Sequence, residues 1–444
     1  MSDSTMGQVR VDQRQVSDDP EYRAKGRKTL RGAIFAFFVD MFDVYLPVIA
    51  LAPAINYFIQ PGATQTEMAT LTAAIFAVSL VGRPIGSIVF GILGDRIGRR
   101  KTTVIVAAGF ATCTGLIACM PGYAAIGWLA PALLILLRLV NGAFLGGEYT
   151  AANPLAMEYA PRHRRGLYGS LLNIGYPAAL GFITILTAVT LQIFPQGDAT
   201  SAYSVWGWRI PFVVGFILSV MVFLHYSRSI PESELWSKTT PVANPLRTLF
   251  SGRNLRSFLV AAVTSTGTWF IMNGTIGVFA GHFKLLGTQI GTVNTTVLIA
   301  AVISMALFPL VGMAGQKFGR RPVYLAIGAV NITVSPLSLL WAINNPGSTA
   351  AVVLGGAVAI ISGLVVFAMI TAYIMEMFPT EIRSSGYGIA YSLPSVIPAF
   401  YPYYLLGLSA FMPYAYTPIV ILVLGSVLLC TGALLSKDLR HVEL

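Results

Sequence analysis

Hydrophobic residues gather in long runs along this chain, and short polar or glycine- and proline-rich stretches separate the runs. Each run holds about 20 or more residues, which is the length that an α-helix needs to cross the apolar core of a bilayer. Breaker clusters such as Pro121-Gly122 lie between the runs and favour turns. The pattern predicts twelve transmembrane helices, at residues 30–58, 67–92, 102–122, 128–157, 166–194, 209–227, 256–282, 291–314, 322–343, 349–377, 385–408 and 416–436.

Composition agrees with a membrane protein and excludes the main soluble classes. Hydrophobic residues make up 55% of the chain and charged residues only 11%, whereas a soluble domain carries about a quarter charged residues. No basic helix with interleaved aromatic residues accompanies the net charge of +11, so no nucleic acid partner is expected. The three cysteines, Cys113, Cys119 and Cys430, lie inside apolar runs and give neither a disulfide framework nor a metal site.

Lysine and arginine residues alternate between the loops, and this alternation sets the orientation. They fill both tails and the connections after even-numbered segments, whereas the connections after odd-numbered segments hold almost none, Lys284 being the exception. Positive loops stay in the cytoplasm, so both chain ends are expected there. The polar first residues show no cleavable signal peptide. The expected organisation is a tail at 1–29, six helices at 30–227, a cytoplasmic linker at 228–255, six helices at 256–436 and a tail at 437–444.

Two motifs occur twice, about half a chain apart. The stretch Gly91–Arg100 (GILGDRIGRR) returns as Gly312–Arg321 (GMAGQKFGRR). The stretch 158–165 (EYAPRHRR) corresponds in the same way to 376–383 (EMFPTEIR). Repeated halves in a hydrophobic chain are typical of secondary transporters, in which one half rocks against the other around a central site. The chain is therefore expected to move a solute across a membrane.

The first-half loop motif resembles that of the major facilitator superfamily of transporters. It fits the family pattern Gly-x-x-x-Asp-(Arg/Lys)-x-Gly-(Arg/Lys)-(Arg/Lys) at every specified position. Further stretches resemble the metabolite:proton symporter branch, namely 83–86 (RPIG), 138–148 (RLVNGAFLGGE), 158–161 (EYAP) and 206–212 (WGWRIPF). One departure lies in the first segment, where the branch has an acidic-Trp-Tyr-Asp run and this chain reads VDMFDVY at 39–45. The resemblance implies an all-α membrane fold, with two pseudo-symmetric six-helix bundles around a central cavity.

Five ionisable side chains fall inside the apolar runs of the first half: Asp40, Asp43, Arg83, Arg138 and Glu148. Such groups are costly at membrane depth, so each needs a partner or a function. Counting about 1.5 Å per residue along two oppositely directed helices places Asp43 and Arg138 at similar depths near the bilayer centre. Protonation of the Asp would release the Arg for an anion, and the resemblance implies this proton-coupling role. The alternative is a static ion pair that fixes helix packing.

The other three charges have more than one interpretation. Asp40 and Arg83 lie at similar distances from the cytoplasmic ends of their helices, so they could pair as a second coupling site, as an inner gate or as a structural contact. Glu148 lies about 15 Å beyond Arg138 along one helix and is rotated away from it, which excludes a simple intrahelical pair. It could carry a proton, or it could neutralise Arg83.

The repeated loop motif is expected to form a gate that closes the inner face. Asp95 would lie near the positive N-terminal end of a second-half helix, and Arg99 would reach toward Glu158. The second copy has the neutral Gln316 in place of Asp95, so its latch should be weaker. Anchoring by positive charge alone would explain the arginines but not Asp95. The expected gate residues are Arg83, Asp95, Arg96, Arg99, Glu158, Glu376 and Arg383.

The substrate site is expected between the halves, with Arg138 as the contact for an anion. The second half has almost no charge before Glu376, so neutral polar and aromatic side chains would complete the site. The leading candidates are Trp269, Asn273 and Tyr391. No nucleotide loop, nucleophile elbow or His/Cys metal spacing occurs in the sequence, so neither enzyme chemistry nor a cofactor is expected.

These features predict a proton-coupled symporter that takes up a small organic acid or a similar metabolite by alternating access. The alternative is a proton-driven exporter of drug-like compounds, because exporters share the loop motif. Against export, the fifth segment reads NIGYP at 173–177, where antiporters carry a proline-glycine pattern. The expected partners are the small-molecule substrate, protons and the lipid bilayer of the inner or plasma membrane, and the expected state is a monomer.

Overall fold

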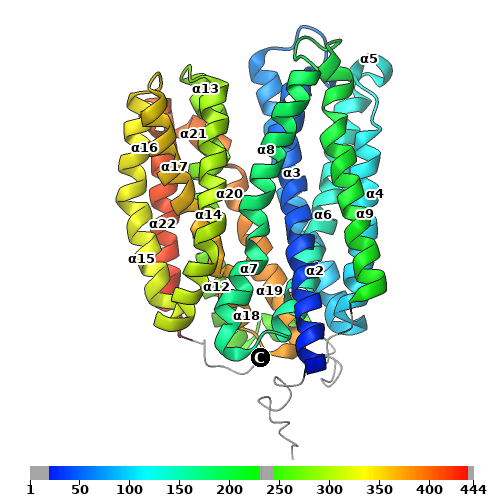
Figure 1. Cartoon of the computed structure of the whole chain (residues 1–444), viewed down its shortest axis with the longest axis vertical. Coiled ribbons are helices and arrows are strands. Elements are labelled where there is room, and N and C mark those ends of the chain that lie inside the picture. Colours follow the sequence, from blue (N-terminus) through cyan, green and yellow to red (C-terminus); the bar gives the residue numbers. More distant parts are fainter. Residues whose placement is uncertain (1–19, 231, 233–241, 243, 439–444) are drawn as a thin grey trace, which may run out of the picture.

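A computed structural model describes residues 20–230, 232, 242 and 244–438, apart from the side chains of residues 20–23, 65, 66 and 69. Within those residues all regular elements are helices, and no strand is present. The long helices run roughly parallel to one another and gather in two groups, one from each half of the chain (Figure 1). The two helical bundles predicted from the sequence are confirmed.

Helices of the two halves follow the predicted segments in order. In the first half they are α2 (Pro20–Tyr45), α3 (Gln65–Ile97), α4 (Arg99–Ala118), the short α5 (Tyr123–Ile126), α6 (Leu129–Glu158), α7 (Arg165–Asn173) with α8 (Gly175–Ile193), and α9 (Arg209–Ser229). In the second half they are α12 (Gly252–Met272) with α13 (Val278–Leu285), α14 (Ile290–Phe318), α15 (Arg320–Ile332) with α16 (Val334–Asn344), α17 (Thr349–Val365) with α18 (Ile370–Met375), α19 (Arg383–Ser392) with α20 (Val396–Ala399) and α21 (Tyr401–Leu408), and α22 (Thr417–Leu435).

Eleven helical stretches of the described chain are long and apolar enough to span a membrane. The predicted segment at 385–408 is not among them, because it is divided into α19, α20 and α21. Pro394, Pro398 and Pro402 lie in this stretch, and a proline removes a backbone donor and clashes with the preceding turn. The remaining crossing of the twelve-helix fold is therefore built from three short helices.

The first and seventh crossings are interrupted at corresponding places. A π-helical turn, η1 (Leu46–Leu51), follows α2, and another, η5 (Asn273–Gly277), separates α12 from α13. Irregular turns at matching positions of two repeats are a pointer to the binding region of a transporter. The sequence analysis did not predict these breaks, although Pro47 lies in η1 and Gly274 and Gly277 lie in η5.

The two loop motifs lie at the same end of the bundle, called the motif end below, where α2 begins and α22 ends (Figure 1). Gly98 separates α3 from α4 with φ 108°, and Gly319 separates α14 from α15 with φ 105°. Glycine adopts such φ angles at little cost, whereas a side chain would be strained. The repeated glycine of the motif is therefore required by the turn between two membrane helices.

Glycine residues bring α3 and α6 together backbone to backbone. A Cβ atom on Gly82 or Gly86 of α3 would collide with the backbone of α6, and one on Gly142 or Gly146 of α6 would collide with the backbone of α3. Such Gly-x-x-x-Gly pairs allow close contact of membrane helices. Since α3 carries the buried Arg83 and α6 carries the buried Arg138, the contact helps to fix where these two guanidinium groups lie.

Two predicted boundaries need correction. Helix α2 begins at Pro20, so the last residues of the predicted tail at 1–29 are helical. The predicted linker at 228–255 ends earlier than expected, because α12 begins at Gly252 and a short helix, α11 (Pro245–Leu249), precedes it. Outside the bilayer a helix needs no apolar side chains, so hydrophobic runs underestimate its length. Parts of the predicted tails and linker, at 1–19, 231, 233–241, 243 and 439–444, lie outside the described residues.

Candidate substrate and proton site

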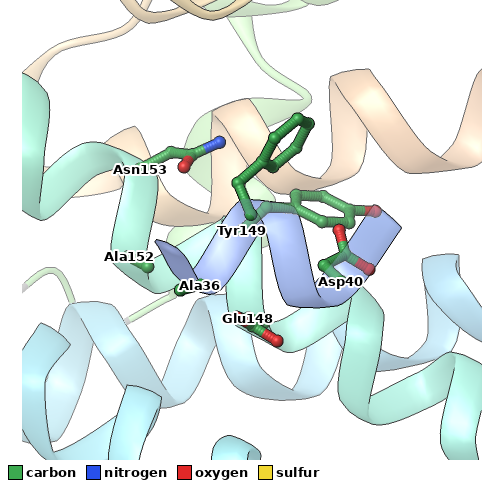
Figure 2. A pocket seen from close by; sticks show the side chains of 7 residues that line it. Ala36, Asp40, Glu148, Tyr149, Ala152 and Asn153 are labelled. Atoms are coloured by element: carbon green, nitrogen blue, oxygen red, sulfur yellow. The ribbon is translucent and has the colours of Figure 1, made fainter. Parts of the chain in front are cut away.

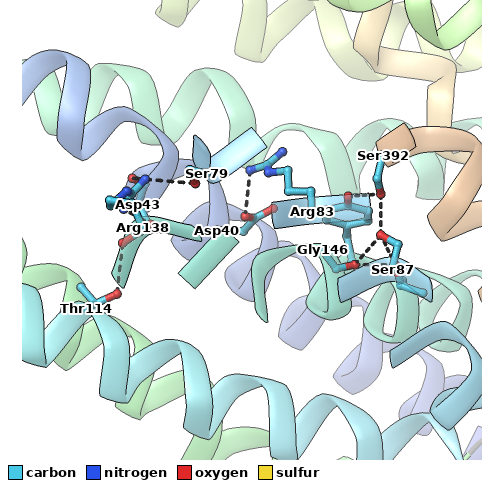
Figure 3. Close-up of polar contacts among 11 residues, drawn as sticks. Asp40, Asp43, Ser79, Arg83, Ser87, Thr114, Arg138, Gly146 and Ser392 are labelled. Atoms are coloured by element: carbon cyan, nitrogen blue, oxygen red, sulfur yellow. Dashed lines mark hydrogen bonds and ion pairs between the residues drawn. The ribbon is translucent and has the colours of Figure 1, made fainter. Parts of the chain in front are cut away.

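The first buried ion pair joins Asp43 of α2 to Arg138 of α6. Arg138 Nη1 lies 2.8 Å from Asp43 Oδ2, and both residues are fully buried. Arg138 also donates to Ser79 Oγ of α3 at 3.3 Å, and Thr114 of α4 donates to Asp43 Oδ1 at 3.1 Å. Figure 3 shows this network. The contact predicted from helix depth is present, and the partners named here all come from the first half.

A second buried pair, Asp40 with Arg83, lies about one helical turn away along α2 (Figure 3). Arg83 Nη2 is 3.4 Å from Asp40 Oδ1, which is a longer contact than the first pair has. Nε and Nη1 of Arg83 have no hydrogen-bond partner among the described residues, although the side chain is fully buried. Unpaired buried donors are costly, so a ligand that accepts hydrogen bonds from them gains that energy.

Aromatic rings from both halves surround Arg83. Its guanidinium carbon lies 5.9 Å from the ring centroid of Tyr149 on α6 and 5.8 Å from that of Trp269 on α12. The ring centroid of Tyr391 on α19 is 5.0 Å from that of Tyr149 and 5.6 Å from that of Trp269. The Tyr391 hydroxyl has no hydrogen-bond partner in the described part of the chain. These four residues, called the Arg83 cage below, join the two bundles.

Two of the residues expected to bind substrate lie outside the Arg83 cage. Arg138 is held by the first-half network, and Asn273 donates to the Pro398 carbonyl oxygen at 2.8 Å, which ties η5 to α20. Trp269, by contrast, is in the cage and donates from Nε1 to the Tyr391 carbonyl oxygen at 3.2 Å. Arg138 is therefore paired within the first half, whereas Arg83 lies among the cage rings with two nitrogen atoms that lack a partner in the described chain.

Tyr149 is the cage residue that the sequence analysis missed. Its hydroxyl group hydrogen-bonds to Ser392 of α19, which also contacts Ser87 of α3. One turn further along α6, Asn153 donates to the Tyr387 hydroxyl at 2.9 Å. Residues four apart share a helix face, so a polar stripe that continues from Tyr149 to Asn153 was the available signal. It marks the face of α6 that meets the second half.

A small cavity lies beside Asp40 in the first half (Figure 2). Its lining consists of Ala36, Phe37, Asp40, Glu148, Tyr149, Ala152 and Asn153. Both carboxyl oxygens of Glu148 are buried and lack a hydrogen-bond partner among the described residues. Of the two interpretations of Glu148, a contact that neutralises Arg83 is therefore not formed, and Arg83 pairs with Asp40 instead. An ionised carboxylate without a donor is unfavourable there, so Glu148 is suited to hold a proton.

At the motif end, Glu158 of α6 binds arginines from two helices. Arg383 Nη1 of α19 lies 2.8 Å from Glu158 Oε1, and Arg99 of α4 contacts the same oxygen. Arg99 also donates to the Thr380 carbonyl oxygen of the second half at 3.0 Å. The predicted contact between Arg99 and Glu158 is confirmed, and Arg383 extends it across the two halves.

Asp95, near the end of α3, holds the first turn of α19. Its Oδ2 accepts hydrogen bonds from the Ser385 backbone N–H at 3.0 Å and from the Ser385 hydroxyl at 2.6 Å. A carboxylate at the positive end of a helix is stabilising, as the sequence analysis expected. In the other half, Gln316 accepts from the Gly166 N–H in the first turn of α7 at 3.0 Å. Gln316 thus keeps the geometry of Asp95 and lacks its charge.

The second half repeats the arginine–glutamate contact of the first. Arg320 Nη2 lies 2.9 Å from Glu376 Oε1 and donates to Gln316 Oε1 at 2.9 Å. Both charged side chains are buried. Arg96, in contrast, is exposed, and its expected role in the gate stays a prediction.

Glu232 makes a contact that the sequence analysis did not identify. Its carboxylate accepts hydrogen bonds from the backbone N–H groups of Arg99 at 3.0 Å and Arg100 at 3.1 Å, at the start of α4. Its carbonyl oxygen accepts from the Tyr159 hydroxyl at 3.1 Å. The first N–H groups of a helix lack acceptors within the helix, and an acidic residue in the linker supplies one here. The linker therefore touches the loop motif of the first half.

Comparison with known proteins identifies the family. The sequence model of the Major Facilitator Superfamily matches residues 33–402. The chain is 32% identical over 394 residues to the inner membrane metabolite transport protein YhjE of Escherichia coli strain K12, which covers 84% of this chain and 85% of that protein. It is also 31% identical over 403 residues to the alpha-ketoglutarate permease of the same organism. This alignment covers 89% of this chain and 89% of the permease.

Solved structures share the fold. The structure of the proton:xylose symporter XylE bound to 6-bromo-6-deoxy-D-glucose aligns with a TM-score of 0.74 over 94% of this chain and 98% of that chain, at 18% sequence identity. The match to the family model and the two relatives above 30% identity each span most of the chain. This multi-pass membrane protein is a secondary transporter and belongs to the major facilitator superfamily.

Proposed function

We propose that this transporter is a proton-coupled symporter that takes up a small organic anion by alternating access. The observation that carries the proposal is the Arg83 cage, in which a buried guanidinium with two unpaired N–H groups meets aromatic rings of both halves. Alternating access needs an occupant that contacts both halves, because one half moves against the other around it. A carboxylate is a strong acceptor for a guanidinium group. Similarity to the alpha-ketoglutarate permease supports an organic acid as the substrate.

Asp43 is the proposed proton carrier, with Arg138 as its partner. Protonation removes the negative charge that holds Arg138, so the ion pair weakens. Arg138 also donates to Ser79, which precedes Arg83 by one turn of α3. Asp40, the partner of Arg83, in turn precedes Asp43 by nearly one turn of α2. A change in the first pair is thereby transmitted along two helices to the Arg83 cage.

Glu148 is the second candidate for proton transfer. It lines one cavity together with Asp40, and its carboxyl oxygens lack donors among the described residues. A proton that leaves Glu148 therefore has an acceptor nearby in Asp40. We assign Glu148 the role of a proton store. We assign the coupled exchange to Asp43 because, of the three central carboxyl groups, Asp43 holds an arginine in the short contact.

The motif end is the proposed cytoplasmic gate, and it is closed in this structure. The positive loops lie at this end, which indicates that it faces the cytoplasm. Contacts of Glu158 with Arg383 and of Asp95 with Ser385 join the two halves there. Both contacts have to break before the Arg83 cage can open to the cytoplasm. The strength of the gate therefore biases the transporter toward its outward-facing or occluded states.

Replacing Asp43 with Asn should abolish proton-driven accumulation but leave exchange of substrate across the membrane measurable. The amide keeps the size of the carboxyl group and cannot take up a proton. Uptake would be measured in proteoliposomes with an imposed pH gradient, using the best ligand of a thermal-shift panel of carboxylic acids, betaines and sugars. The control is Asp198→Asn, an exposed change outside the site. If Asp43→Asn still concentrates the substrate, the coupling role passes to Glu148 or Asp40.

Replacing Arg83 with Lys should lower substrate affinity about 10- to 100-fold, because an ammonium group cannot match the hydrogen bonds of the guanidinium fork. The charge that faces Asp40 is kept, so the protein should remain folded. Arg138→Lys, in the first-half network, should bind substrate nearly as the wild type does. Affinity would be read from ligand-dependent shifts in the melting temperature, with the exposed change Arg253→Lys as a control. Loss of affinity in Arg138→Lys alone would return the anion contact to Arg138.

Replacing Asp95 with Asn should open the cytoplasmic side. Loss of a charge at a helix N-terminus costs about 0.3–1 kcal/mol, which changes the ratio of closed to open gates about two- to fivefold. Gln316→Ala should have a smaller effect, because it removes only a neutral hydrogen bond. The readout is thiol labelling of Ala152→Cys in a cysteine-free background, compared between inside-out and right-side-out vesicles. Equal shifts from the two changes would show that the charge asymmetry of the gate has no role.

A further inference from the structure

The centre of this protein carries a one-sided set of charges. Arg83, Arg138, Asp40, Asp43 and Glu148 are all buried, and all belong to the first half. In the second half no Asp, Glu, Lys or Arg occurs at 257–283, 285–316, 322–375 or 384–435, all of which the structure describes. The charged residues of that half lie at the two ends of its helices. Whatever binds in the Arg83 cage therefore meets charge on one side only.

The two central arginines are not equally available. Arg138 is held by the short contact with Asp43 and by Ser79. Arg83 has one long contact with Asp40, and its Nε and Nη1 groups are unpaired within the described chain. Arg138 leaves only its Nε unpaired, so Arg83 has more N–H groups to offer a ligand, and one guanidinium group can satisfy one carboxylate. The proton that Asp43 accepts offsets the single negative charge that this carboxylate brings into the membrane centre.

We infer that the Arg83 cage takes monocarboxylates and discriminates against dicarboxylates, so that this chain differs in substrate from the alpha-ketoglutarate permease, whose name gives a dicarboxylate. The inference rests on the proposed function, since it assumes that the cage is the anion site. A second carboxylate would lie among the rings of Tyr149, Trp269 and Tyr391, where the second half supplies no cation. An unpaired charge at membrane depth is strongly disfavoured. The aromatic faces instead suit an apolar or ring-shaped body attached to the single carboxylate.

The free hydroxyl of Tyr391 does not remove this restriction. It is one neutral donor, whereas an ionised carboxylate has about four acceptor positions to satisfy. The amide of Asn273 is already bound to the Pro398 carbonyl oxygen, and the indole N–H of Trp269 is bound to the Tyr391 carbonyl oxygen. The second half therefore offers too few donors to replace a cation.

Pairs of compounds that differ only in the second carboxylate test the inference. Purified wild-type protein would be titrated with benzoate against phthalate and with monomethyl succinate against succinate, at about pH 7.5, where free carboxyl groups are ionised. Binding is read from the shift in melting temperature and from competition with the best ligand of the panel. The monocarboxylate of at least one pair should bind about 50-fold or more tightly than its dicarboxylate. Arg83→Gln should lose this binding, and Arg253→Gln, an exposed change outside the site and the gate, should keep it.

The outcomes separate the inference from the proposed function. If the dicarboxylates bind with affinities within about fivefold of those of the matching monocarboxylates, the inference is overturned. The anion site at Arg83 then stays in place if Arg83→Gln abolishes binding of both compounds of a pair. Absence of binding by the monocarboxylates would overturn the inference together with the proposed anion site. The comparison between compounds uses the wild-type protein, so a variant that fails to fold does not affect the result.

Discussion

Compensation of buried charge in the membrane is the constraint on which the rest of this structure depends. An unpaired charge at membrane depth is disfavoured by at least about 2.5 kcal/mol, and five ionisable side chains lie in the core of the first bundle. Asp43 with Arg138 and Asp40 with Arg83 compensate each other across α2, α3 and α6. The glycine contact between α3 and α6 holds the arginines in reach of the carboxylates. Charge balance and helix packing therefore support one another.

The two halves share a fold but differ in the charged residues that they contribute to the centre. At the motif end, the Arg99–Glu158 contact of the first half has its counterpart in Arg320–Glu376 of the second. In the centre the symmetry ends, because the second half contributes Trp269 and aromatic or hydroxyl neighbours but no charge. The repeated contacts at the motif end suit a rocking motion of the two halves. In the function proposed above, the asymmetric centre lets one half hold both the proton and the anion. The neutral Gln316 continues this asymmetry into the gate.

Sequence reasoning reached the helices, the repeat, the Asp43–Arg138 contact and the position of Asp95, because membrane depth and helix ends follow from residue counting. It missed what depends on rotation about a helix axis and on irregular backbone. Arg83 was assigned to the gate because its depth was known and its direction toward Trp269 was not. The breaks at η1 and η5 contain Pro47 and Gly274, but a proline or glycine inside a membrane helix does not by itself say where the helix becomes irregular. Glu232 reaches α4 through a tertiary contact that no local pattern predicts.

The central claim is that the buried centre accepts an anion only together with a proton. The most direct test is to measure whether the protein takes up protons when it binds substrate. Purified protein in weakly buffered detergent solution would be mixed with the best monocarboxylate of the panel, and the change in pH would be followed with an indicator dye. About one proton per bound anion is expected for the wild type, and none for Asp43→Asn. Binding of the anion to the wild type without proton uptake, or equal uptake by both proteins, would contradict the claim.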